Sequence, residues 1–77
     1  MGNMYVGVHQ TGRKVELSWD GYCFSYQTDF EEGGAKNLAL AKLMAQAHSF
    51  SKEELKEIDH KEGWTWRIVP PSEQKIS

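Results

Sequence analysis

The ten residues LSWDGYCFSY, from Leu17 to Tyr26, place an Asp-Gly pair between two stretches in which large and small polar side chains alternate. Alternation with a period of two is typical of a β-strand with one buried face. Asp-Gly between two such stretches predicts a two-residue hairpin turn, because both central residues of that turn need positive φ and these residue types tolerate it. We therefore expect the chain to fold around an antiparallel hairpin.

A turn at Asp20 and Gly21 determines which side chains of the two strands share a face. It sets Trp19 opposite Tyr22 and places six large side chains on one side: Val15, Leu17, Trp19, Tyr22, Phe24 and Tyr26. A slip of one residue would turn all of them to solvent. We expect this side of the hairpin to be the core.

A second alternation upstream predicts another strand, with Thr11-Gly12 as the turn that follows it. Pairing about that turn sets Val8 opposite Val15. It adds three apolar side chains to the core side, namely Met4, Val6 and Val8. The three strands of this antiparallel meander are expected over residues 4–9, 14–19 and 22–28.

A helix is predicted from about Gly34 to His48, after a loop over residues 29–33, because this segment is rich in Ala, Leu and Met. Four apolar side chains recur at helical spacing and are expected to lie on the sheet: Leu40, Leu43, Met44 and Ala47. The other side of the helix is also apolar, and it carries Leu38, Ala41 and Ala45. Either the next helix covers these three residues, or they form a flat groove for another chain.

Ser51 and Glu54 have the spacing of a capping box and predict a second short helix, which Gly63 closes. The alternating stretch WTWRIV that follows predicts a fourth strand, and two prolines end it. The resulting order is β-β-β-α-α-β. We expect a two-layer α+β fold, an antiparallel sheet with helices on one face, in a single domain over residues 1–71, with a loose tail over 72–77.

A chain of 77 residues buries only about 60% of the surface that its unfolded form exposes, so its large aromatic side chains Trp19, Tyr22, Phe24 and Tyr26 are needed in the core. The single cysteine, Cys23, excludes an internal disulfide. It lies far in sequence from every histidine, and no spacing typical of metal ligands links them. We predict no catalytic residue, no metal site and no cofactor, and therefore a protein that is not an enzyme.

The formal net charge is −2 with both signs interspersed, which disfavours nucleic acid as a partner and leaves no polybasic patch for a membrane. The apolar runs are too short to cross a bilayer, and the N-terminal stretch MGNMYVGV lacks the pattern of a signal peptide. We expect a cytoplasmic protein.

Two resemblances bear on function. The segment GGAKNLALAKLMAQA, residues 33–47, resembles the second helix of double-stranded-RNA-binding domains, which implies RNA contacts; two glycines stand here where that family has a lysine pair. The short acidic chain with a hairpin sheet, this Ala-rich helix and the closing stretch WTWRIVPP resembles small phage-encoded inhibitors of the anti-CRISPR type. That resemblance implies a protein target and identifies no site residue.

These features favour a non-enzymatic protein–protein interaction module, a phage-type inhibitor of a host complex such as a CRISPR effector, which binds a target protein or a second copy of itself. The contact residues are expected on the second side of the helix, at one aromatic of the polar sheet face and in the acidic loop: Leu38, Ala41, Ala45, Tyr5, Asp29, Glu31 and Glu32. The alternative is a small RNA- or DNA-binding domain that uses Arg13, Lys36 and Lys42.

Overall fold

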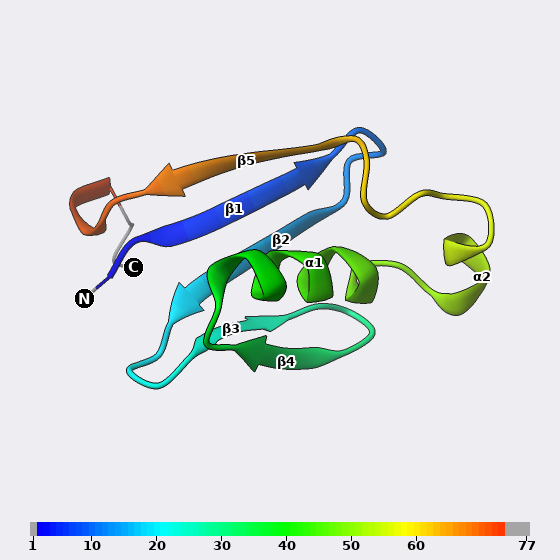
Figure 1. Ribbon diagram of the computed structural model, residues 1–77. Coiled ribbons are helices and arrows are strands. Elements are labelled where there is room, and N and C mark those ends of the chain that lie inside the picture. The colour runs from blue at the N-terminus through cyan, green and yellow to red at the C-terminus, as the bar shows by residue number, and fades with distance from the viewer. Residues whose placement is uncertain (1, 74–77) are drawn as a thin grey trace.

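A five-stranded antiparallel sheet with one helix packed across a face forms the protein in the computed structural model, which describes residues 2–73 (Figure 1). The strands are β1 (Met4–His9), β2 (Lys14–Trp19), β3 (Phe24–Gln27), β4 (Glu32–Ala35) and β5 (Trp64–Val69), in the spatial order β4-β3-β2-β1-β5. The helices are α1 (Leu38–His48), α2 (Lys52–Leu55) and the 3-10 helix η1 (Pro71–Glu73). The predicted α+β class is confirmed. Residues 74–77 of the predicted tail lie outside the described residues.

The β2–β3 hairpin has the predicted faces but not the predicted register. Trp19 lies opposite Phe24, because the connection has four residues instead of two. The Asp20 carboxylate accepts hydrogen bonds from the backbone N–H groups of Cys23 (2.9 Å) and Tyr22 (2.8 Å), which hold this loop and lower the pKa of Asp20, the bond from Cys23 most. A shift of two positions keeps every side chain on its face. Tyr22 leaves the core and is 69% exposed in the loop, and Trp19 keeps its face but is 43% exposed.

The β1–β2 connection is a three-residue loop, and the predicted two-residue turn is wrong. Gly12 in this loop has a φ of 97°, and its N–H donates to His9 O (2.8 Å), while His9 N–H donates to Arg13 O (2.7 Å). A left-handed glycine is typical of three-residue hairpin loops. The pairing moves by one position, so Tyr5 lies opposite Leu17 and every side chain of β1 changes face.

The change of face puts a glycine and a histidine of β1 under the helix layer. Tyr5, Gly7 and His9 lie on the side of α1, whereas Met4, Val6 and Val8 lie on the opposite side, which we call the open face. Gly7 pairs with Trp66 of β5, whose ring covers the position that a Cβ would occupy. The His9 ring is 2% exposed and packs between Phe50 and Trp64, at centroid distances of 5.1 and 5.2 Å.

Helix α1 begins four residues later than predicted, because residues 32–35 form the edge strand β4 instead of a loop and a first turn. The Asn37 side chain caps the helix by accepting a hydrogen bond from Leu40 N–H (3.1 Å). Ala41 and Ala45 are fully buried against the sheet, while Leu40 and Leu43 are exposed. The predicted orientation of this helix is therefore wrong: the small side chains let its backbone approach the sheet closely, and the leucines point away.

The second helix has the predicted capping box, in which Ser51 and Glu54 each accept a hydrogen bond from the other's backbone N–H. It ends at Leu55, so Gly63 does not close it, although Gly63 does have a positive φ of 83°. Strand β5 follows at the predicted position and pairs with β1. The buried core joins the two layers and consists of Val15, Leu17, Tyr26, Ala41 and Ala45.

Candidate protein-binding surface

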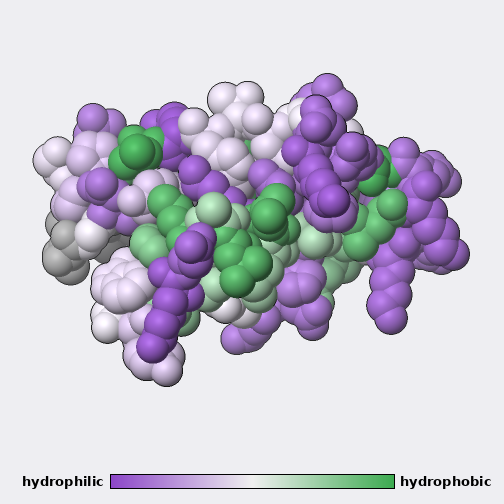
Figure 2. Space-filling view, in the orientation of Figure 1, coloured by the Kyte–Doolittle hydropathy of each residue, from purple (hydrophilic) through white to green (hydrophobic). Residues whose placement is uncertain are grey.

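The side of α1 that points away from the sheet is apolar. Leu40 is 51% exposed and Leu43 is 48% exposed, and with Ala47 they follow the helical spacing of one stripe. We call this stripe the α1 outer face. Figure 2 shows hydrophobic side chains gathered over α1, with hydrophilic side chains on both sides of them.

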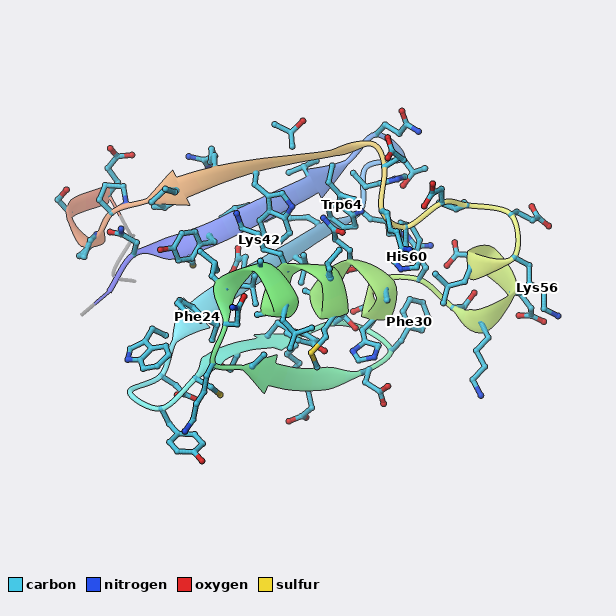
Figure 3. All side chains as sticks on the ribbon, in the orientation of Figure 1. Phe24, Phe30, Lys42, Lys56, His60 and Trp64 are labelled. Atoms are coloured by element: carbon cyan, nitrogen blue, oxygen red, sulfur yellow. The ribbon has the colours of Figure 1, made fainter. Side chains whose placement is uncertain are left out.

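The α1 outer face leads into a groove at the C-terminal end of the helix, with a volume of about 430 Å³. Ala47 belongs to both. The groove is lined by the apolar side chains Phe30, Ala47, Phe50 and Leu55. Phe30 comes from the β3–β4 loop, is 50% exposed and lies beside the end of α1 (Figure 3). Glu31 and Lys52 add one charge of each sign to the lining.

Arg13 holds the walls of this groove together. Its Nη1 donates to the backbone oxygen of Ser49 (2.7 Å), and its Nη2 forms an ion pair with the Glu54 carboxylate. The guanidinium carbon lies 5.7 Å from the ring centre of Phe30 and 5.3 Å from that of Phe50. One side chain from the β1–β2 loop thus connects the β3–β4 loop, the end of α1 and α2.

The Glu54 carboxylate is held in its ionised form at this junction. Its hydrogen bond from the Ser51 backbone N–H (2.9 Å) lowers its pKa most; burial opposes this in part, and the charge of Arg13 lowers the pKa by a smaller amount than burial raises it. The ion pair with Arg13 is therefore present at neutral pH.

A chain of hydrogen-bonding side chains lies beside the groove. The Tyr26 hydroxyl is 2.5 Å from His48 Nδ1, and His48 Nε2 is 3.5 Å from a Glu31 carboxylate oxygen. The Tyr26 hydroxyl can donate to Nδ1, which orients the ring so that Nε2 faces the Glu31 carboxylate. Thr28 Oγ1 donates to the His48 backbone oxygen (2.6 Å) and fixes the end of α1. His48 and Glu31 can offer a hydrogen bond to a polar group bound in the groove.

Replacement of Tyr26 by phenylalanine is expected to lower the free energy of unfolding by about 1–2 kcal/mol at neutral pH, because His48 Nδ1 loses its donor. Burial, and secondarily the charge of Glu31, raise the pKa of Tyr26 above its ordinary value of 10.0. The unfolded chain therefore loses this proton first, so the contribution to stability is complete below pH 10 and is lost as the pH rises through the folded-state pKa.

Urea denaturation of the wild type and of Tyr26→Phe between neutral pH and strongly alkaline pH measures this difference. The wild type should lose more stability above pH 10 than the variant does. Parallel pH dependences for the two proteins would contradict the assignment to Tyr26.

The residues that the sequence indicated for partner binding do not form one exposed surface. Ala41 and Ala45 are fully buried and Leu38 is half-buried, so their predicted place on the outside of the helix is wrong. Tyr5 is half-buried on the α1 side, edge-on to Phe24 at 6.0 Å, and not on the polar sheet face. In the acidic loop Asp29, Glu31 and Glu32 are exposed, and only Glu31 lines the groove.

The three cations indicated for nucleic-acid binding do not converge either. Lys36 precedes α1 and holds its Nζ 4.4 Å from the ring centre of Tyr22. Lys42 lies on the side of α1 nearer β1 (Figure 3), with its Nζ 5.2 Å from the Trp66 ring centre. Arg13 is bonded at the other end of a helix about 16 Å long.

Within residues 2–73 no three His, Cys, Asp or Glu side chains come together as metal ligands would. Cys23 is half-buried in the β2–β3 loop, and its sulfur lies 3.9 Å from the Asp20 carboxylate. No helix in this part of the chain has the length and apolar character needed to cross a membrane.

Comparison of the chain with protein-family models, with curated proteins and with solved structures found no match.

Proposed function

We propose that the protein is a non-enzymatic interaction module that binds a partner protein through the α1 outer face and the adjoining groove. The observation that carries the proposal is the half-exposure of Leu40 and Leu43 on a helix of 11 residues. A helix on the surface of a small domain normally presents polar side chains to water. Contiguous exposed apolar side chains with a polar rim mark contact sites instead.

The partner that fits this surface is an amphipathic helix. An apolar stripe that ends in a groove is the form in which proteins receive the spaced apolar anchors of such a helix. The groove offers Phe30 and Leu55 to one large anchor, and the buried Phe50 completes the apolar lining. Glu31 and Lys52, of opposite sign, orient a helix that carries complementary charges.

The double variant Leu40→Glu/Leu43→Glu is expected to weaken binding of a partner captured by the wild type at least about a hundredfold, because it removes two apolar anchors and places charges at the contact. Its stability should change by no more than about 0.5 kcal/mol per site, since both positions are exposed. Partners are captured from the host lysate, and their dissociation constants are then measured with purified proteins.

The matched control is Val8→Glu, which adds the same charge at a position of the open face that is 42% exposed. It should retain full binding. A partner that binds the double variant as tightly as the wild type, or that Val8→Glu also releases, would remove the α1 outer face from the proposal.

The resemblance to small phage-encoded inhibitors supports a more specific form of the proposal, in which the partner is a subunit of a host defence complex such as a CRISPR effector. Expression of the chain in a bacterium with active CRISPR interference should then restore plaque formation by a targeted phage. The Leu40→Glu/Leu43→Glu variant should not restore it. Equal plaque counts with and without the chain would rule out inhibition of CRISPR interference, while the more general proposal of an interaction module would stand.

A further inference from the structure

The two edges of the sheet differ in their ability to pair with another strand. Proteins protect exposed edges with short strands, Lys, Pro or bulges. β4 is such an edge, with four residues and two adjacent glycines. β5 is a six-residue edge of aromatic and β-branched residues, WTWRIV, and it pairs with β1 without an interruption of register. No element of the described chain lies along its outer side (Figure 1).

The hydrogen bonds between β1 and β5 determine which backbone groups of β5 point toward β1 and which point to the open edge. Gln10 N–H donates to Gly63 O (2.9 Å), which extends the β1–β5 register by one pair. Hydrogen-bonded pairs alternate along an antiparallel ladder, so Thr65 and Arg67 direct their N–H and C=O groups at β1. The N–H and C=O groups of the intervening residues point to the open edge: Trp64, Trp66 and Ile68.

We propose that β5 pairs with β5 of a second copy of the chain, antiparallel, about a two-fold axis at Trp66. Trp66 then lies opposite Trp66 of the second copy, and Trp64 lies opposite Ile68 of the second copy. Each of these residues exchanges two hydrogen bonds with its opposite. All outward backbone groups of the strand are paired in this one register.

The side chains select the same register. Residues directly opposite one another must share a face of the sheet. The two-fold axis can therefore pass only through a residue and not between two residues. An axis at Arg67 would place two arginines opposite each other and Trp64 opposite Pro70, which has no N–H. An axis at Thr65 would place Ile68 opposite Glu62. The axis at Trp66 instead pairs Arg67 with Thr65.

The contact also covers apolar surface that the single chain exposes. Ile68 is 58% exposed on the α1 side of β5, and Trp64 is half-buried. Their pairing across the axis is an aromatic contact with a β-branched side chain, which stabilises antiparallel strands. The two sheets become continuous with matching faces, so both α1 outer faces lie on one side of the dimer. Such a dimer could engage two target helices at once.

Two variants at position 68 test the pairing by sedimentation velocity over a wide range of protein concentration. The wild type should change from monomer to dimer as the concentration rises. Ile68→Pro removes an N–H that points away from β1 and should weaken the dimer at least about tenfold, while the monomer stays folded. Ile68→Thr keeps the N–H and a β-branched side chain, and should still form the dimer.

Amide exchange of the wild type is a second test that needs no variant. The N–H groups of Trp64, Trp66 and Ile68 should exchange slowly in the dimer and fast in the monomer. A wild type that stays monomeric throughout would overturn the proposal. So would fast exchange at these amides in the dimer, or a dimer that Leu40→Glu/Leu43→Glu abolishes and Ile68→Pro does not. The first two results leave the binding of a target by the α1 outer face unaffected, whereas the third would make that face the dimer contact.

Discussion

Replacement of Gly7 by valine is expected to lower the free energy of unfolding by about 3 kcal/mol, which is a large part of the stability of a domain this small. A Cβ at this position would lie 2.8 Å from three atoms of the Trp66 ring. Trp66 cannot yield easily, because it stacks on Trp64 at a centroid distance of 6.0 Å and lies beneath Lys42. Urea denaturation followed by far-UV circular dichroism measures the loss.

A double-mutant cycle identifies the cause of that loss. Gly7→Ala should destabilise the wild type, but in a Trp66→Leu background the same change should be neutral or stabilising, because alanine restricts the unfolded chain more than glycine does. Equal costs of Gly7→Ala in both backgrounds would show that the Trp66 ring is not what excludes a side chain at position 7.

The contact between Gly7 and Trp66 could not be read from the sequence, since it depends on the length of one loop. Thr11-Gly12 suits a two-residue turn by composition, but the left-handed residue is Gly12 alone, at the end of a three-residue loop. One additional loop residue reverses the faces of β1. Tyr5 thereby moved from the predicted polar face to the helix side, and Val8 moved to the open face.

In the β2–β3 hairpin an error in the predicted loop length did not change the predicted faces, because side chains alternate between the two faces of a strand. Asp20 stabilises a loop of four residues by accepting two backbone hydrogen bonds, so the predicted register was wrong by two positions. Because the period of a strand is two, Leu17, Trp19, Phe24 and Tyr26 kept the predicted face. The α+β class and the strand after Gly63 were predictable because alternation over six residues does not depend on loop length.

The candidate site was not predictable from the periodicity of α1, because both sides of this helix are apolar. Hydrophobicity favoured Leu40 and Leu43 for the core, whereas the packing distance favoured Ala41 and Ala45. Two alanines one turn apart are a signal for close approach of a helix backbone, and their size could have been weighed against the hydrophobicity of the leucines. The groove could not be predicted at all, since it needs Phe30, Phe50 and Leu55 from three separate segments.

Replacement of Ala45 by glutamate is expected to lower the free energy of unfolding by about 4 kcal/mol or more and to leave the chain largely unfolded at room temperature. Ala45 is fully buried in the core, so a larger side chain has no space and a carboxylate there has no water. Leu43→Glu should change stability by no more than about 0.5 kcal/mol, since Leu43 is 48% exposed.

The matched control is Ala39→Glu, the same substitution at an exposed position of the same helix. It should be neutral or slightly stabilising, because residue 39 lies in the first turn of α1, where a negative charge interacts favourably with the helix dipole. The three variants together show which side of α1 faces the sheet, and not only whether the helix forms. If α1 lay on the sheet through its leucines, Leu43→Glu would be the unfolding variant and Ala45→Glu would be the neutral one, and the α1 outer face would have to be sought on the alanine side.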